Sequence, residues 1–231
     1  MFFSFVFLAA RHRDVVSPTN LLEGIKRAKT LPSESYYRTM LYLKSLASTL
    51  GLFTLLAAGH GIVTNPAPRA IGDANLAACG AAVNKVLKSD KAGPIENAAA
   101  KIDAAYNAAA CHLFFCRGLQ YEDNKSNTRV YKPGTVVPFH IDIIAHHTGY
   151  ANVSVVNLAT QKPIGTPLFL WPVYTNNSLG PPDWPKNETD FEVKIPDLGT
   201  QCTKGGACAI QWWWYAYNGQ TYQSCVDFTT V

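Results

Sequence analysis

Cysteine pairs with the spacing used for redox or zinc chemistry are absent from this sequence. No Cys-x-x-Cys motif occurs among the six cysteines, and the closest pairs, Cys111/Cys116 and Cys202/Cys208, are spaced more widely than a thioredoxin site or a zinc knuckle prefers. The even number of cysteines, all after residue 60, instead predicts disulfides in an oxidising compartment. We expect Cys202 to pair with Cys208 and close a Gly-containing turn, whereas the spacing leaves the other pairings open.

Most of the chain has no net excess of positive or negative charge. Residues 1–59 contain seven Lys/Arg and three Asp/Glu, which accounts for the whole net charge of +4, and residues 60–231 contain thirteen of each sign. A neutral domain offers no surface that would neutralise phosphates, so nucleic acid is not an expected partner. The sequence also contains no motif of paired acids that would indicate a hydrolase.

The apolar stretch over residues 46–58 is too short for a comfortable membrane span. It follows Lys44, and the small residues Ala57 and Gly59 occupy the −3 and −1 positions before His60. We therefore expect residues 40–59 to be a signal peptide that is cleaved before His60, and the product to be secreted into the extracellular space. A single-pass membrane anchor is the alternative. No hydrophobic tail follows the last strand-like run, so a lipid anchor is not expected.

Residues 1–39 precede this segment, although a signal peptide belongs at the N-terminus. We expect them to be a spurious or disordered upstream extension and the native product to start at Met40. Residues 60–231 then form a single domain. The secretory interpretation gains support from four Asn-x-Ser/Thr acceptor sites for N-glycosylation, namely Asn124, Asn152, Asn176 and Asn187.

The composition changes from helix-forming to strand-forming residues along this domain. Residues 75–109 are rich in Ala and are interrupted by Gly93-Pro94, which predicts two short helices. From residue 129 onward, β-branched and aromatic runs separated by Pro and Gly predict strands, with clear alternation in VPFHIDIIAHH and CAIQWWWY. We expect a mainly β fold: an immunoglobulin-like antiparallel β-sandwich with a short helical insertion near the N-terminus of the mature chain.

The run Trp212-Trp213-Trp214-Tyr215 allows two interpretations. Alternation in a strand places Trp212 and Trp214 on one face and Trp213 and Tyr215 on the other, so at least one pair belongs to the core. Core packing is the favoured interpretation and sugar stacking is the alternative. Tyr150 is a further candidate for a sugar-binding aromatic residue.

Cleavage before His60 would create an unusual metal ligand. The first residue would then offer its free α-amine and its ring Nδ1 to one metal ion, and one more histidine would complete a set of three nitrogens. Copper prefers nitrogen ligands in tetragonal geometry and stands at the top of the divalent affinity order. The sequence therefore predicts copper as the cofactor.

Three segments carry a resemblance to a known family. They are HGIVTNPAPR at 60–69, AHHTG at 145–149 and GQTYQSC at 219–225, and they resemble the lytic polysaccharide monooxygenases. The opening and the general layout look closest to fungal members of the chitin-binding type-4 group. Gln220 and Tyr222 resemble the glutamine-any-tyrosine pattern of the fungal cellulose-active family, and many bacterial relatives have Phe where this chain has Tyr222.

The resemblance implies a role for each matching residue. His60 and His147 would be the equatorial copper ligands, Tyr222 the axial group, and Gln220 a donor to bound oxygen. His147 is preferred over His146 because Gly149 lies two residues further on, as in the family's histidine-any-glycine step. In a regular strand His146 would point to the opposite face.

The resemblance also implies an activity, which is the oxidative cleavage of glycosidic bonds in an insoluble polysaccharide of the chitin or cellulose type. The expected partners are that polysaccharide and an external electron donor, with no membrane partner after cleavage, and the enzyme is expected to be a monomer. Two alternatives stay open: a non-catalytic copper-binding protein with the same histidine ligands, and a polysaccharide-binding module without redox activity.

Overall fold

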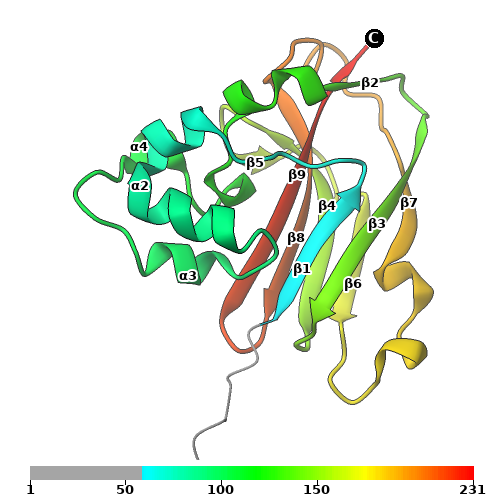
Figure 1. Cartoon of the computed structure of the whole chain (residues 1–231). Helices are drawn as coiled ribbons and strands as arrows, with labels where there is room; N and C mark the ends of the chain where they lie inside the picture. The colour runs from blue at the N-terminus through cyan, green and yellow to red at the C-terminus, as the bar shows by residue number, and fades with distance from the viewer. Residues whose placement is uncertain (1–58) are drawn as a thin grey trace, which may run out of the picture. The chain divides into compact units, whose positions relative to one another are not determined.

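The computed structural model describes residues 59–231 (Figure 1). The predicted extension 1–39 lies outside the described residues, and so does the predicted signal peptide except for Gly59. Among the described residues, the helices are all too short or too polar to cross a membrane.

Two β-sheets form the body of the domain. The smaller sheet has the order β1-β3-β7 and is antiparallel, with strands β1 (His60–Asn65), β3 (Val136–Ala145) and β7 (Asp190–Lys194). The larger sheet has the order β2-β9-β8-β4-β5, with β6 also paired to β4; its strands are β2 (Arg129–Tyr131), β4 (Gly149–Asn157), β5 (Lys162–Pro163), β6 (Phe169–Tyr174), β8 (Cys208–Ala216) and β9 (Gln220–Thr230). All pairs are antiparallel except β2–β9, which is parallel. The predicted antiparallel β-sandwich is confirmed.

Alternation along β8 decides which aromatic residues form the core. Trp212 and Trp214 have no exposed surface and pack in the main hydrophobic cluster, together with Val137, Phe139 and Ile141 of β3. Burial of each large apolar side chain stabilises the fold by roughly 2–3 kcal/mol. The prediction that one pair of this aromatic run packs in the core is confirmed, and Trp213 and Tyr215 lie on the outer face.

A helical insertion lies between β1 and β2, beside β9 (Figure 1). It contains α2 (Asp73–Ser89), α3 (Ile95–Ala99) and α4 (Ala108–Cys111), followed by the short 3-10 turns η3 (Cys116–Gly118), η4 (Tyr121–Asp123) and η5 (Lys125–Asn127). The prediction of only two helices was wrong, because the second is divided. The side chains of Asp103 and Asn107 accept hydrogen bonds from the main-chain nitrogens of Ala105 and Ala110, and such local bonds compete with a continuous helix.

Three disulfides connect these parts, and every described cysteine is paired. Cys202–Cys208 confirms the predicted pair. Cys79–Cys111 joins α2 to α4 inside the insertion, and Cys116–Cys225 fastens the insertion to β9. The insertion is therefore held firmly against the larger sheet.

Strand β1 was not predicted. It is only six residues long, its sequence HGIVTN does not alternate between apolar and polar residues, and it pairs with β3 through a register that shifts twice. The Pro-rich segment that follows β6 forms the predicted loop, with the 3-10 turns η6 (Pro181–Asp183) and η7 (Lys186–Glu188) on either side of Trp184.

Candidate metal centre

The sheet topology brings the two predicted histidine ligands to the same end of the sandwich. β1 is an edge strand, and its first residue, His60, pairs with Ala145 at the end of β3. The loop that leaves β3 therefore passes beside His60, and this loop contains His147. The two histidines are far apart in sequence, so their proximity is a consequence of the β1–β3 pairing.

Gly59 marks the centre of the site. Its main-chain nitrogen donates a hydrogen bond to Gln220 Oε1 at 3.3 Å. A Cβ atom at Gly59 would lie 2.5 Å from Tyr222 Oη and 2.7 Å from Cδ2 of the His147 ring. The residue before His60 thus touches His147, Gln220 and Tyr222, and the structure brings all four predicted site residues together around the peptide bond that links residues 59 and 60.

Hydrogen bonds to Gln220 Oε1 fix the orientation of this side chain, which lies at the start of β9. Oε1 accepts hydrogen bonds from Tyr222 Oη at 2.6 Å and from Asn218 Nδ2 at 2.9 Å, in addition to the one from Gly59. These contacts hold the amide so that Nε2 is the atom of Gln220 able to donate to a ligand. The Tyr222 ring stacks on Trp214 with the centroids 4.3 Å apart.

The Tyr222 hydroxyl is neutral at ordinary pH. Burial raises its pKa, and the nearby carboxylates of Glu96 and Asp90 raise the pKa further, while Arg117 acts in the opposite direction. A neutral phenol that is hydrogen-bonded to Gln220 is a weak ligand, so at a metal site here Tyr222 would occupy space without neutralising the charge of the ion.

Asp90 is a site residue that the sequence did not reveal. Its Oδ2 lies 3.0 Å from Nε2 of the His60 ring, the geometry of a carboxylate that orients a metal-binding histidine. The other ring nitrogen, Nδ1, is nearer the main chain, so it is the one that can form a chelate with a terminal amine. No motif or spacing indicates Asp90, because it belongs to the turn after α2 and meets His60 only in the folded domain.

Arg117 and Glu96 support this arrangement from the helical insertion. Arg117 donates hydrogen bonds to the main-chain oxygens of Asp90 and Gly93. Burial lowers the pKa of Arg117 to about 10, although Asp90 and Glu96 oppose this change, so the guanidinium keeps its charge at neutral pH. Glu96 Oε2 accepts from the main-chain nitrogen of Thr221 at 2.9 Å, which connects α3 to β9 next to Tyr222.

His146 and His147 lie in a loop, so strand alternation does not apply to them. The His146 ring packs edge-on against Trp184 with the centroids 4.9 Å apart, whereas the His147 ring lies next to Gly59. The main-chain oxygen of His147 accepts a hydrogen bond from Thr175 Oγ1 at 2.7 Å. These contacts support His147, rather than His146, as the second ligand.

Gly149 is required where β4 begins beside this loop. A Cβ atom at Gly149 would collide with the main-chain oxygen of Tyr215 and lie 2.8 Å from Cα of Ala216, so the strand β8 leaves no room for a side chain. We expect Gly149→Ala to destabilise the domain by about 1–3 kcal/mol in urea denaturation and to weaken copper binding by displacing the loop with His147. Gly180→Ala is the matched control, because its Cβ would make only an ordinary contact at 3.6 Å. Equal behaviour of the two variants would contradict this explanation.

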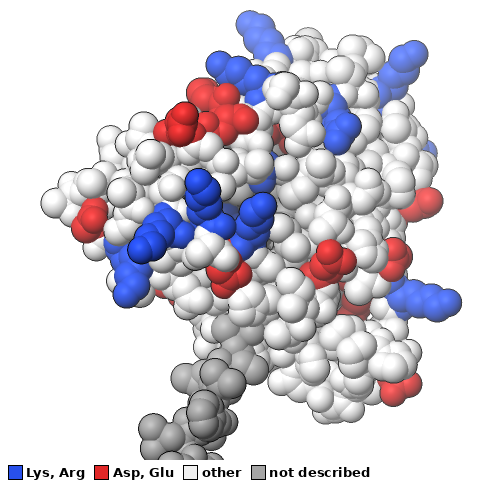
Figure 2. Space-filling view, in the orientation of Figure 1, with Lys and Arg blue, Asp and Glu red and all other residues white. Residues whose placement is uncertain are grey.

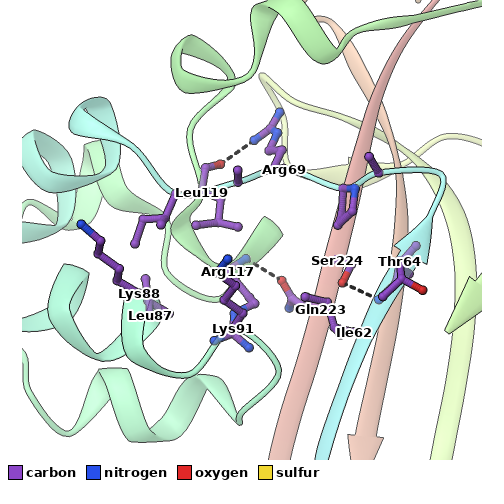
Figure 3. Close-up of a pocket in the computed structure, with 15 residues that line it drawn as sticks. Ile62, Thr64, Arg69, Leu87, Lys88, Lys91, Arg117, Leu119, Gln223 and Ser224 are labelled. Atoms are coloured by element: carbon purple, nitrogen blue, oxygen red, sulfur yellow. Dashed lines mark hydrogen bonds between the residues drawn. The ribbon is translucent and has the colours of Figure 1, made fainter. Parts of the chain in front are cut away.

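A cavity of about 510 Å³ lies beside the site, between β1, α2 and β9 (Figure 3). Ile62, Leu87 and Leu119 contribute apolar walls, with Lys88 and Lys91 among the lining residues. None of the four predicted site residues lines it.

Figure 2 shows Lys and Arg side chains gathered over the helical insertion, with acidic side chains between and around them.

The donor set of the site fits a copper ion only if the main chain takes part. Among the described residues, no group of three or more His, Cys, Asp or Glu side chains is arranged to hold a metal. Two imidazoles and one terminal amine would provide three nitrogen donors, the set that copper prefers. Cleavage between Gly59 and His60 would supply the amine at the point where the other residues already converge.

Comparison with known families identifies a match over most of the chain. A family model described as "Lytic polysaccharide mono-oxygenase, cellulose-degrading" matches residues 60–228, from the first residue of β1 nearly to the end of β9. No significant match was found among curated proteins.

Proposed function

Because the chain belongs to the family of lytic polysaccharide monooxygenases, we propose that its mature form is a secreted, copper-dependent oxidoreductase that begins at His60 and cleaves insoluble polysaccharide. The observation that carries this proposal is the convergence of His147, Gln220 and Tyr222 on Gly59, the residue that cleavage would remove. The description of the matching family favours cellulose as the first substrate to test, with chitin as the second.

His60 and His147 would hold the metal in this proposal. When bound, copper supplies the redox chemistry by which electrons from an external donor and an oxygen-derived oxidant lead to oxidation at C1 or C4 of the sugar. Asp90 orients the His60 ring through Nε2, and Arg117 holds the turn that carries Asp90. Tyr222 would restrict one side of the site, and Gln220 could donate a hydrogen bond from Nε2 to a reactant that lies beside it.

The position of the site suits a substrate that cannot enter a cleft. The site lies where β1 begins, where the loop between β3 and β4 passes and where β9 starts, at one end of the sandwich (Figure 1). An edge strand that begins at the site would present its first residue, whose side chain is 29% exposed, to a flat surface of packed chains. This exposure favours an insoluble polysaccharide over a small soluble sugar.

The test is to incubate copper-loaded protein that begins at His60 with cellulose and with chitin in the presence of ascorbate, and to identify the products by mass spectrometry. Oxidised oligosaccharides that appear only with the reductant are expected. Tight copper binding without such products would favour the non-catalytic copper-binding protein. Binding to polysaccharide that is unchanged by chelation and by His60→Ala, again without products, would favour a binding module.

Neighbouring histidines provide a matched pair of variants. We expect His147→Ala to lower copper affinity and product formation by at least about 100-fold, because a ligand matters at least as much as the outer partners whose loss costs 10–100-fold. His146→Ala should keep both within a few-fold, because that ring packs on Trp184. Calorimetric titration with Cu(II) measures the affinity. The opposite order of the two variants would assign the ligand to His146.

A further inference from the structure

The outer face of the larger sheet carries a group of large apolar side chains, which we call the aromatic patch: Tyr150, Leu170, Trp213, Tyr215 and Tyr217. The Tyr150 ring is 5.3 Å from Trp213, 5.7 Å from Tyr215 and 6.3 Å from Tyr217, centroid to centroid. Trp213 and Tyr215 lie nearly parallel, with an interplanar angle of 11°. Tyr150 is 38% exposed, Leu170 56% and Tyr217 62%. A contiguous exposed apolar patch marks a surface that contacts another group.

Asn152 lies within the aromatic patch. It follows Tyr150 by two residues on β4, so both side chains are on the same face. In the register of the sheet it is directly opposite Trp213 of β8 on one side and Leu170 of β6 on the other. Apolar residues therefore surround Asn152 from three directions.

Asn152 is also the acceptor of an Asn-Val-Ser motif. Its Oδ1 accepts a hydrogen bond from Ser154 Oγ at 3.0 Å, which orients the amide. Within residues 59–231, none of the observed hydrogen bonds uses its Nδ2, the atom to which a glycan is attached. Asn152 is only partly buried, so the fold leaves this atom available.

The structure separates this acceptor site from the one at Asn124. Asn124 is only 4% exposed, and its Nδ2 donates to the main-chain oxygens of Ala70 and Gln120 at 2.9 and 2.8 Å. Its Oδ1 accepts from the main-chain nitrogen of Ala70. Because the fold uses the whole amide, Asn124 does not support the secretory interpretation in the way its motif suggested. Asn187 is exposed in η7 and provides an internal reference.

We propose that Asn152 carries an N-linked glycan whose first sugar packs on Tyr150 and Trp213 and covers the aromatic patch. The apolar face of a pyranose ring presents C–H groups, which pack well on the faces of amphipathic aromatic rings. The donor is a lipid diphosphate-linked oligosaccharide. A bond forms between sugar C1 and Nδ2, the bond between C1 and the phosphate oxygen breaks, and the Nδ2 proton is lost as the lipid diphosphate leaves. The proposal rests on the proposed secretion but not on copper binding.

Site occupancy is tested on the full chain secreted from a eukaryotic host that performs N-glycosylation. Release of glycans by peptide N-glycosidase in ¹⁸O water labels each occupied asparagine, and mass spectrometry of the peptides measures the label. Most Asn152 should be labelled and Asn124 should not. An unlabelled Asn152 beside a labelled Asn187 would overturn the proposal. Absence of label at every site of the secreted protein would also overturn this proposal, whereas failure of the chain to reach the medium would overturn the proposed secretion, and the copper site is tested separately by titration.

Contact between the sugar and the patch is tested by heat denaturation in an Asn176→Gln/Asn187→Gln background. An endoglycosidase that leaves one sugar on Asn152 should not change the melting temperature, whereas removal of that last sugar should lower it by about 2–4 °C. The Tyr150→Leu variant keeps an apolar side chain but loses the aromatic ring. In this variant, removal of the last sugar should lower the melting temperature by less than half as much. Equal melting temperatures with and without the last sugar would overturn the contact, and so would cellulose binding by the secreted protein that depends on Tyr150 and Trp213.

Discussion

Protein that keeps one residue in front of His60 is expected to bind copper at least about 100-fold more weakly than protein that begins at His60, a loss of at least about 2.7 kcal/mol of binding free energy. An amide nitrogen within a chain cannot act as the amine ligand. The preceding residue also lies against Tyr222 Oη and His147 Cδ2, so it occupies the space in which a metal would bind. Calorimetric titration with Cu(II) measures the affinity of both forms, and oxidised products from cellulose should fall with it.

The matched control carries the same extra residue after Val231, at the other end of the domain. This form should bind copper as tightly as the protein that begins at His60. Glycine is the suitable added residue at either end, because a larger side chain in front of His60 would collide with Tyr222 and test crowding in addition to the amine. Equal copper affinity and equal activity in the two extended forms would remove the terminal amine from the proposed site.

Strand periodicity carried most of the fold prediction. The alternation in the sequence of β8 placed Trp212 and Trp214 together on one face, and both are fully buried in the structure. Periodicity could not locate β1, because that strand is short, begins with His60-Gly61 and pairs with β3 through two register shifts. It also could not show that β2 pairs with β9 in parallel, since pairing depends on partners that are distant in sequence.

Some residues of the candidate site could be predicted from the sequence, and others could not. His60, His147, Gln220 and Tyr222 carry a recognisable pattern, and the structure places them around Gly59. The residues that orient them have no such pattern. Asp90 reaches His60 from the helical insertion, which Cys116–Cys225 and Glu96 fasten to β9, and a pairing between distant cysteines cannot be deduced from spacing.

Removing one partner of the buried ion pair between Arg69 and Asp227 is expected to destabilise the domain strongly. Arg69 Nε and Nη2 donate to the two carboxylate oxygens of Asp227 at 2.8 and 2.7 Å, and Nη1 donates to the main-chain oxygen of Leu119. The side chains are only 6% and 2% exposed. We expect Asp227→Ala to lower the free energy of unfolding by about 3–5 kcal/mol, because it leaves the guanidinium buried without its partner. Urea denaturation measures the change.

This cost comes from the unpaired charge rather than from the strength of the pair, so removing both charges should restore most of the stability. An Arg69→Met/Asp227→Leu variant replaces the pair with apolar side chains of similar size and should be more stable than Asp227→Ala. Asp190→Ala is the exposed counterpart, because Asp190 pairs with His140 at the surface and should change the stability only slightly. If the double variant were as unstable as Asp227→Ala, the pair would contribute through its shape and its hydrogen bond to Leu119, and the explanation by buried charge would be wrong.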